Sequence, residues 1–359
     1  MATFSYYMKS TILLIGLLMA SLGTTSAEIG VCYGLDGNNL PSKPNVIALF
    51  NSNNIRRIRL YRTDHDAMEA LRGSNIEVTL GILNENLQSM ATNQGNAKNW
   101  VQTNVLNYAN NVMFSYIVVG NEVEPSSPFA QYLVPAMQNI QNEINAAGFG
   151  NQIKVSTAIG MNTIGVPFPP SAGAFRSDFR PILDPVIGFL VNNQAALHLN
   201  LYPFFTYNND PAHIPLDYAL FRATSPVVTD GPYQYYNLFD AQLDTVYAAL
   251  EKVGGGTSLQ KDAGRSGSRD IVVSESGWPT GPGRPHPNGL DQATSIDNAR
   301  IYNQNLINHV KSGTPRRPGK PIEAYIFAMF DENQKPSPNI EGHWGLFLPN
   351  GQPKYPINF

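Results

Sequence analysis

Two glutamates stand at matching positions, each directly after a short apolar run. Glu122 ends the stretch 116–122, and Glu275 follows the β-branched residues 271–273. Uncharged runs of this kind are typical of strands covered on both faces of a parallel sheet, and Gly277 and Pro279 then end the second run. One such glutamate would most simply be the first polar residue past a strand. Two of them on separate strands predict a pair of carboxylates at the C-terminal edge of the sheet, where α/β folds bind ligands.

A pair of carboxylates suffices for glycoside hydrolysis. One acid protonates the leaving oxygen, and the other attacks the anomeric carbon or activates a water. Asn121 would add an amide beside Glu122. Competing machinery is not evident: the six histidines lack metal-ligand spacing, Ser274 and Ser276 do not lie in a Gly-x-Ser-x-Gly turn, and the glycine-rich stretch 254–269 lacks the Gly-Lys-Ser/Thr ending of a phosphate loop. We therefore expect neither a metal nor a cofactor.

Apolar β-rich runs alternate with amphipathic stretches along the chain and would position these side chains. Helical spacing covers residues 46–50, 100–108, 133–144, 243–250 and 301–310. Eight such units predict an α/β fold, a (β/α)8 TIM barrel in a single domain, in which all strand ends share one rim. A doubly wound open sheet would need fewer strands or a second domain, and no linker marks one. The expected strands cover residues 29–34, 57–61, 77–83, 116–122, 154–160, 196–203, 270–275 and 323–331.

Residues 1–27 are interpreted as a secretory signal peptide, which leaves residues 28–359 as the catalytic barrel domain. Lys9 supplies the positive region, residues 12–20 form an apolar run, and small residues at 25–27 precede the expected cleavage before Glu28. A membrane anchor is the alternative, but the run is too short to span a bilayer. Cys32 is the only cysteine, so we expect stability to come from a large core rather than from an internal disulfide.

The composition argues against several classes of partner. Hydrophobic residues make up 42% and charged residues 14% of the 359 residues, and the net charge is −3. No block of Lys and Arg is present to follow a phosphate backbone, so we expect no nucleic-acid partner. No stretch after the signal is long and apolar enough to cross a bilayer, so we expect no membrane partner. We also expect a monomer.

The strand-end residues resemble motifs of plant glycoside hydrolase family 17, the β-1,3-glucanases. Val119-Gly-Asn-Glu122 resembles the acid/base motif of that family, and Val273-Ser-Glu-Ser-Gly-Trp-Pro279 resembles its nucleophile motif. The stretch 254–269 is longer than expected before the nucleophile strand, and by topology it would lie at the rim opposite the catalytic one. The resemblance extends over residues 28–359 and includes the first strand, the last strand and the segment after it: Ile29-Gly-Val-Cys-Tyr-Gly34, Glu323-Ala-Tyr-Ile-Phe-Ala-Met-Phe-Asp-Glu-Asn333 and His343-Trp-Gly-Leu-Phe347.

By this resemblance Glu275 is the nucleophile and Glu122 the acid/base of a retaining mechanism, with the two carboxyl groups about 5–5.5 Å apart. At that spacing the charge of Glu275 should raise the pKa of Glu122 and keep it protonated. The resemblance also implies that Glu323 and Glu332 support the site, together with Asn121. For Glu323 the alternative is a solvated residue at the start of a strand.

The implied substrate is a long, uncharged β-glucan, so binding should come from ring stacking and hydrogen bonds. Aromatic residues near the expected strand ends are the candidates for stacking. Tyr33 and Tyr202 are favoured because each lies at the C-terminal end of a strand. The full set is Tyr33, Tyr202, Phe204, Phe205 and Trp278.

Two other functions remain open for this sequence. A glucanase that prefers mixed β-1,3/1,4 linkages would use the same carboxylates, because cleft shape separates the two activities. A non-catalytic glucan-binding defence protein is also open, although a pure binder needs neither Glu122 nor Glu275. The resemblance implies a secreted plant enzyme of the apoplast or cell wall, with a role in defence or wall glucan. A vacuolar location is less favoured, because we see no C-terminal extension of the kind that some vacuolar relatives carry.

Overall fold

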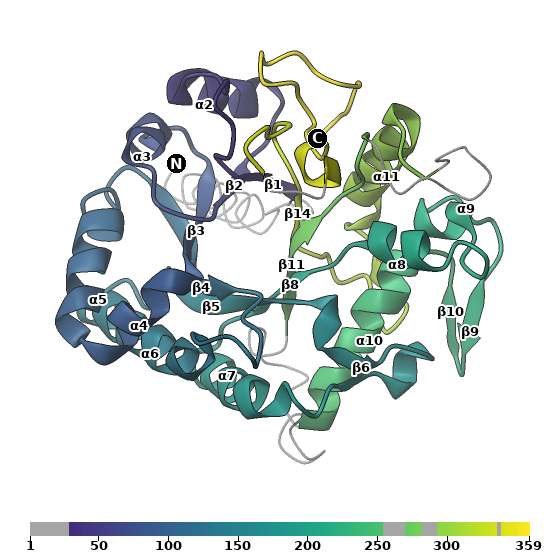
Figure 1. Cartoon of the computed structure of the whole chain (residues 1–359), viewed down its shortest axis with the longest axis horizontal. Helices are drawn as coiled ribbons and strands as arrows, with labels where there is room; N and C mark the ends of the chain where they lie inside the picture. The colour runs from purple at the N-terminus through teal and green to yellow at the C-terminus, as the bar shows by residue number, and fades with distance from the viewer. Residues whose placement is uncertain (1–28, 254–269, 282–292, 336–338) are drawn as a thin grey trace, which may run out of the picture.

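Eight parallel strands close into a barrel, as the alternation of runs predicted (Figure 1). The computed structural model describes residues 29–253, 270–281, 293–335 and 339–359. Around the barrel the strand order is β1-β14-β11-β8-β5-β4-β3-β2. Each barrel strand therefore lies beside the barrel strands that precede and follow it along the chain, and the last one, β14, pairs with the first, β1. The strands are β1 (Ile29–Tyr33), β2 (Arg57–Leu60), β3 (Glu77–Ile82), β4 (Met113–Asn121), β5 (Lys154–Gly160), β8 (Leu197–Asn200), β11 (Ile271–Ser276) and β14 (Ala324–Ile326).

Helices pack around the outside of the barrel and connect its strands (Figure 1). All five stretches with helical spacing contain helices. The sequence pattern did not indicate α3, α4, α7, α8 and α9; α7 carries Pro185 inside it, which weakens a helical prediction. The helices are α2 (Lys43–Ser52), α3 (His65–Leu71), α4 (Leu87–Thr92), α5 (Gln94–Val101), α6 (Leu133–Ala146), α7 (Arg180–Asn193), α8 (Pro203–Asn209), α9 (Leu216–Ala219), α10 (Leu238–Val253) and α11 (Ile296–His309).

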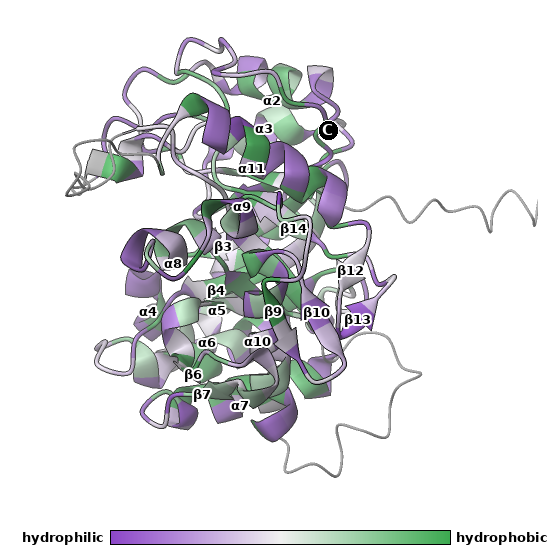
Figure 2. Ribbon diagram, turned by 90° about the vertical axis from the view of Figure 1, so that its right-hand side faces the viewer, coloured by the Kyte–Doolittle hydropathy of each residue, from purple (hydrophilic) through white to green (hydrophobic). Residues whose placement is uncertain are grey.

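The core lies between the strands and the apolar faces of these helices. On α6 the residues at helical spacing, Leu133, Met137, Ile140 and Ile144, are all buried, so one face of this helix packs on the barrel. Every residue of β11 is buried, as expected for a parallel strand covered on both sides. Figure 2 shows the outer helices carrying both hydrophobic and hydrophilic residues, which is the pattern of helices that cover a barrel. Burial of these faces fixes the strands and therefore the positions of their C-terminal ends.

Three short hairpins lie outside the barrel in the described part of the chain. The first, β6 (Ile164–Val166) with β7 (Ala174–Phe175), occupies the Pro-rich region between β5 and α7. The second is β9 (Val228–Asp230) with β10 (Tyr233–Tyr235), and the third is β12 (Gly313–Thr314) with β13 (Arg317–Pro318). The expected signal peptide 1–27 and the stretch 254–269 lie outside the described residues. No helix in the described ranges is both long and apolar enough to cross a membrane.

The last strand is shorter than the sequence predicted. It ends at Ile326 rather than at residue 331, and the chain beyond it pairs with a later segment at the rim. Met329 N–H donates to the carbonyl of Cys32 at 2.8 Å, and Phe347 N–H donates to the carbonyl of Met329 at 3.0 Å. Glu323 precedes the first residue of this strand, at the N-terminal end of the barrel, and Glu332 lies beyond its last residue, at the C-terminal rim.

Candidate active site

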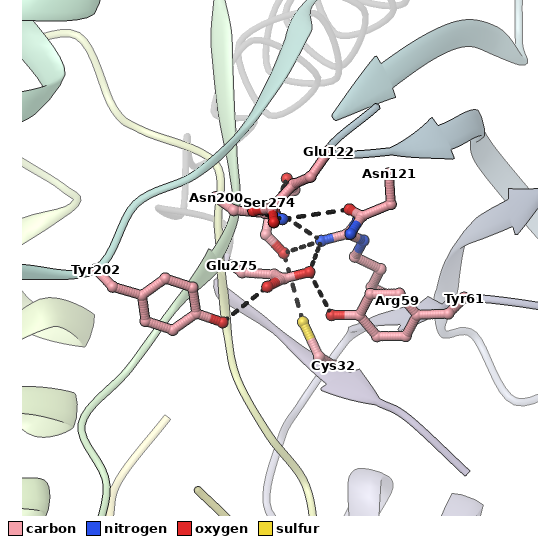
Figure 3. Close-up of polar contacts among 9 residues, drawn as sticks. All are labelled: Cys32, Arg59, Tyr61, Asn121, Glu122, Asn200, Tyr202, Ser274 and Glu275. Atoms are coloured by element: carbon pink, nitrogen blue, oxygen red, sulfur yellow. Dashed lines mark hydrogen bonds and ion pairs between the residues drawn. The ribbon is translucent and has the colours of Figure 1, made fainter. Parts of the chain in front are cut away.

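Glu122 and Glu275 line one cleft of about 800 Å³ at the C-terminal rim of the barrel. Glu275 lies within β11, and Glu122 directly follows β4. Two strands, β8 and β5, separate β11 from β4 in the barrel. The side chains therefore approach one another across the rim although they lie far apart in the sequence (Figure 3).

Three donors hold the carboxylate of Glu275. Arg59 Nη1 and the Tyr61 hydroxyl each donate to Oε1 at 2.8 Å, and the Tyr202 hydroxyl donates to Oε2 at 2.8 Å (Figure 3). Glu275 is only 8% exposed. An ionised carboxylate accepts and never donates, so this set of donors matches it on both oxygens. The contacts also fix the direction in which the carboxylate faces.

Arg59 donates hydrogen bonds to more residues of the site than Tyr61 or Tyr202 does, and it was not selected from the sequence. It lies in β2, is 2% exposed, and its guanidinium sits 4.5 Å from the ring centre of Tyr61. Nη1 donates to the carbonyl of Ser274 at 2.9 Å, and Nη2 donates to Asn121 Oδ1 at 2.8 Å. Nearby acidic groups, led by Tyr61 and Glu275, hold the pKa of Arg59 above its usual value although burial opposes them. An arginine within an apolar strand pattern was the available signal, because a buried cation needs partners.

The backbone at Glu122 is held in the left-handed region, with φ +50°. This conformation costs a non-glycine residue about 1 kcal/mol or more, so the surroundings must enforce it. Glu122 N–H donates to the carbonyl of Ala158 at 2.9 Å. The side chain of Asn84 accepts from Asn121 N–H at 2.8 Å and donates to the carbonyl of Asn121 at 2.9 Å. These bonds turn the end of β4 so that Glu122 opens to the cleft.

The carboxyl of Glu122 has a different environment from that of Glu275. Asn200 Nδ2 donates to Oε1 at 2.9 Å (Figure 3). The pKa of Glu122 is raised above its usual value, first by loss of solvation in the cleft and next by the negative charge of Glu275; the Asn200 bond and the charge of Arg59 act in the opposite direction. A carboxyl with a raised pKa can remain protonated and donate a proton. Asn121, expected beside it, faces Arg59 and Asn200 rather than Glu122.

The aromatic candidates divide into two groups. Tyr202 and Phe205 line the cleft, together with Tyr61, Phe327 and Trp344, which the sequence did not single out.

The remaining candidates are buried and do not reach the cleft. Phe204 packs edge-on against Trp278, and both are fully buried. The indole N–H of Trp278 donates to the carbonyl of Ala293 at 2.7 Å. Tyr33 packs against Phe330, and its hydroxyl accepts from Lys43 Nζ at 3.1 Å. Phe204 also packs against Phe205 and Trp344, which line the cleft, so it supports the cleft wall from behind.

The two supporting carboxylates lie at opposite ends of the barrel. Glu332 is buried at the C-terminal rim, and its Oε1 accepts from Asp36 N–H at 2.9 Å. A Cβ at Gly34 would lie 2.5 Å from the Glu332 carboxylate, so a larger residue there would have to displace that carboxylate. Burial raises the pKa of Glu332.

Glu323 is not brought to this cleft. Its carboxylate lies 2.8 Å from Arg57 Nη1 and accepts from the Tyr325 hydroxyl at 3.1 Å. Arg57 is the first residue of β2, so this ion pair lies at the N-terminal end of the barrel. The position at the start of the strand matches the alternative, but the side chain is ion-paired and largely buried rather than solvated.

Two charged side chains that line the cleft, Lys335 and Glu341, were not among the residues selected from the sequence. Lys335 Nζ lies 4.6 Å from the ring centre of Phe327 and 3.7 Å from Glu332 Oε2. Burial raises the pKa of Glu341, which also lines the cleft. Within the described ranges, no group of three His, Cys, Asp or Glu side chains is arranged to hold a metal ion.

Comparison with known proteins identifies the family. Residues 29–359 match Glycosyl hydrolases family 17. A glucan endo-1,3-β-glucosidase of Pisum sativum is 54% identical over 339 residues, which are 94% of this chain and 86% of that protein. Glucan endo-1,3-β-glucosidase B of Solanum lycopersicum is 51% identical over 352 residues, 97% of this chain and 92% of that protein.

Solved structures agree with this assignment. A chain from a study of two plant β-glucan endohydrolases with distinct substrate specificities is 45% identical, with a TM-score of 0.83, and the match covers 92% of this chain and 100% of that one. A β-1,3-glucanase and pollen allergen of Cryptomeria japonica is 43% identical, with a TM-score of 0.83, covering 92% of this chain and 99% of that one. The chain belongs to glycosyl hydrolase family 17.

Proposed function

We propose that the chain hydrolyses internal β-1,3 linkages of a glucan by a retaining double displacement, with Glu275 as nucleophile and Glu122 as acid/base. The contrast between the two carboxylates carries this proposal. Glu275 accepts from three donors, whereas Glu122 accepts from one amide and has a raised pKa. The activity named for the pea and tomato relatives supports the choice of linkage.

In the first half-reaction a Glu275 oxygen attacks the anomeric carbon from one face of the sugar. The bond to the glycosidic oxygen breaks, and the proton of Glu122 passes to that oxygen, so the leaving chain departs with a hydroxyl group. Arg59 and Tyr61 hold Oε1 of Glu275 during the attack, and Tyr202 holds Oε2. The carboxylate therefore meets the sugar in a fixed direction, which lowers the entropic cost of reaching the transition state.

In the second half-reaction water replaces the enzyme at the anomeric carbon. Glu275 is now an ester and carries no charge, so the electrostatic effect that raises the pKa of Glu122 is removed. Glu122 takes a proton from the water, the water oxygen bonds to the sugar, and the ester bond breaks to restore the Glu275 carboxylate. Two inversions return the original anomeric configuration.

Reducing-sugar release from a linear β-1,3-glucan tests the assignment. Glu275→Gln and Glu122→Gln should each lower the rate by about 10²-fold or more, because each removes one step of the reaction. Glu85→Gln, an exposed carboxylate outside the cleft, is the control and should keep the wild-type rate. The assignment fails if both cleft variants keep the wild-type rate. NMR of the first product should show the β anomer, whereas an α anomer would exclude retention.

Product analysis on a mixed β-1,3/1,4-glucan separates the two linkage preferences. We expect faster cleavage of the linear β-1,3-glucan, in line with the names of the relatives. A higher kcat/KM on the mixed-linkage glucan would reverse the preference while leaving the carboxylate roles intact. Binding of either glucan without turnover would indicate a non-catalytic binding protein instead.

We infer that residues 1–27 direct the chain into the secretory pathway and that the protein acts as a secreted monomer in defence or in wall glucan metabolism. A Nicotiana tabacum relative that is 50% identical is described as a basic vacuolar isoform, so the destinations to separate are apoplast and vacuole. N-terminal sequencing of the mature protein should begin at Glu28, and a fluorescent fusion should locate it outside the cell. Vacuolar fluorescence would overturn the apoplastic location. Inhibition of a fungus with a β-1,3-glucan wall by the wild type, but not by Glu275→Gln, would support the defence role.

A further inference from the structure

Asn200 connects the surroundings of the two glutamates. It is the last residue of β8, is 2% exposed, and pairs in register with Glu275 of β11. Its Nδ2 donates to Glu122 Oε1 at 2.9 Å and to Asn121 Oδ1 at 3.2 Å. Its Oδ1 accepts from Ser274 Oγ at 2.9 Å and from Arg59 Nη1 at 3.2 Å. Both donors and both acceptor positions of this buried amide are thereby used (Figure 3).

Arg59 determines which way the amide of Asn200 faces. A guanidinium can only donate, so the atom 3.2 Å from Arg59 Nη1 must be the amide oxygen. Rotation of the amide by half a turn would set its NH2 group against Arg59 and its oxygen against the oxygens of Glu122 and Asn121. The oxygen of Asn121 is fixed in the same way, because it accepts from Arg59 Nη2 at 2.8 Å. An N–H of Asn200 therefore faces Glu122 whatever the protonation state of the site.

This N–H has a direct consequence for the proton of Glu122. The carbonyl oxygen of a carboxylic acid is a better hydrogen-bond acceptor than its hydroxyl oxygen, so the amide N–H favours Oε1 as the carbonyl oxygen and Oε2 as the oxygen that carries the hydrogen. No hydrogen bond within the described residues reaches Oε2, and the residue opens to the cleft. We propose that Asn200 is a positioning residue for proton transfer: it confines the proton of Glu122 to Oε2 and stabilises the carboxylate when Glu122 acts as a base. This inference rests on the proposed acid/base role of Glu122.

The charged groups around Glu122 set the sign of the expected pH effect. Glu275 faces it from β11 and Glu124 from the chain just beyond β4, and both raise its pKa, as does its loss of solvation. Arg59 from β2 and the amide of Asn200 oppose them. Removal of the amide N–H leaves the raising influences less opposed. The alkaline limb of the kcat/KM profile, which reports the acid in the free enzyme, should then move to higher pH.

The pH dependence of kcat/KM on a linear β-1,3-glucan tests this role. Asn200→Ala should move the alkaline limb up by about one pH unit, and Asn200→Asp should move it further because a second carboxylate then faces Glu122. Both variants should lower kcat/KM about 10- to 100-fold on glucan. The loss should be smaller on 2,4-dinitrophenyl β-laminaribioside, whose leaving group needs no protonation. Asn142→Asp, the same change at an exposed position of α6, should shift neither limb nor rate.

The outcomes separate this role from the acid/base assignment itself. An alkaline limb at the wild-type position in both folded Asn200 variants overturns the positioning role, provided that Glu122→Gln abolishes that limb. If Glu122→Gln instead keeps the wild-type rate and profile, the proposed function fails first. Thermal melts establish that the variants are folded. Asn200→Asp keeps the shape of the side chain, so it carries the test if Asn200→Ala does not fold.

Discussion

Nη1 of Arg59 lies 2.8 Å from Oε1 of Glu275, and the two side chains are 2% and 10% exposed. The pair is therefore a buried ion pair in the wall of the cleft. Breaking such a pair leaves an uncompensated charge, which costs far more than losing an exposed one. The same guanidinium also fixes Asn121, Asn200 and the carbonyl of Ser274. The side chain of Arg59 thus joins the surroundings of Glu275 to those of Glu122.

Arg59→Met should lower the free energy of unfolding by about 3–5 kcal/mol, because the charge of Glu275 then has no counter-ion. Arg59→Lys keeps a positive charge, but the ammonium group of lysine lacks the planar, rigid set of donors with which the guanidinium reaches four acceptors. This variant should therefore lose about 10²-fold or more in kcat, with a smaller loss of stability than Arg59→Met. Urea unfolding and kcat on β-1,3-glucan measure the two effects. Arg56→Met, an exposed neighbour just before the strand, is the control. Wild-type kcat in Arg59→Lys would show that the arrangement of donors on the guanidinium has no role in catalysis.

Tyr202→Phe should reduce kcat more than Tyr61→Phe. Each change removes one hydrogen bond to Glu275, but Oε1 keeps Arg59 when Tyr61 is lost, whereas Tyr202 is the donor to Oε2. A hydrogen bond to a charged group contributes about 1.5–3 kcal/mol, so the loss for Tyr202→Phe should be about 10- to 100-fold. Steady-state kinetics of both variants on one glucan measure the ranking. Equal effects would mean that the two oxygens of Glu275 are held equivalently.

Phe205→Ala should raise KM for glucan with little change in melting temperature, because this ring is 39% exposed in the cleft. Its neighbour Phe204 is 0% exposed and packs against Trp278 and Trp344. Phe204→Ala should therefore cost about 3–5 kcal/mol of stability through the cavity it leaves. Thermal melts and KM measured on both variants compare adjacent positions of the same residue type. A higher KM without destabilisation in Phe204→Ala would contradict its assignment to the core.

Asp244→Asn should stabilise the protein above about pH 6. Burial raises the pKa of Asp244 to about 6, although Arg316 N–H at 3.0 Å and the Tyr235 hydroxyl at 3.1 Å donate to it. Because the folded pKa exceeds the unfolded one, its favourable contribution is complete below the unfolded pKa of about 4 and is lost as pH rises through about 6. An amide stays neutral and accepts the same two bonds.

The stabilisation by Asp244→Asn should reach about 1–3 kcal/mol at pH 7.5 and fall towards zero near pH 4. Denaturant unfolding at both values measures it. The exposed Glu85→Gln is the control, and its effect should be small at both pH values. A difference between wild type and Asp244→Asn that does not change with pH would show that burial of this charge is not the cause.

Local patterns in the sequence determined the barrel and the pair of carboxylates at its rim. Apolar runs and helical spacing are set by burial, and burial repeats along a strand or a helix with a fixed period. The eight runs each produced a barrel strand, and a closed parallel barrel necessarily gathers its C-terminal strand ends at one rim. Glu122 and Glu275 could therefore be placed in one cleft without knowledge of any contact between them.

Only the tertiary structure decided which neighbouring side chains reach that cleft. Glu323 and Glu332 stand on either side of the last strand, and the structure shows that Glu323 pairs with Arg57 at the N-terminal end whereas Glu332 accepts from Asp36 N–H at the C-terminal rim. Phe204 and Phe205 are adjacent, but one is buried and the other faces the cleft. Arg59 and Asn200 acquire their roles from partners on other strands, at separations that no local pattern records. The sequence determines the positions of strand ends because burial is periodic, whereas side-chain direction depends on packing between strands distant in the chain.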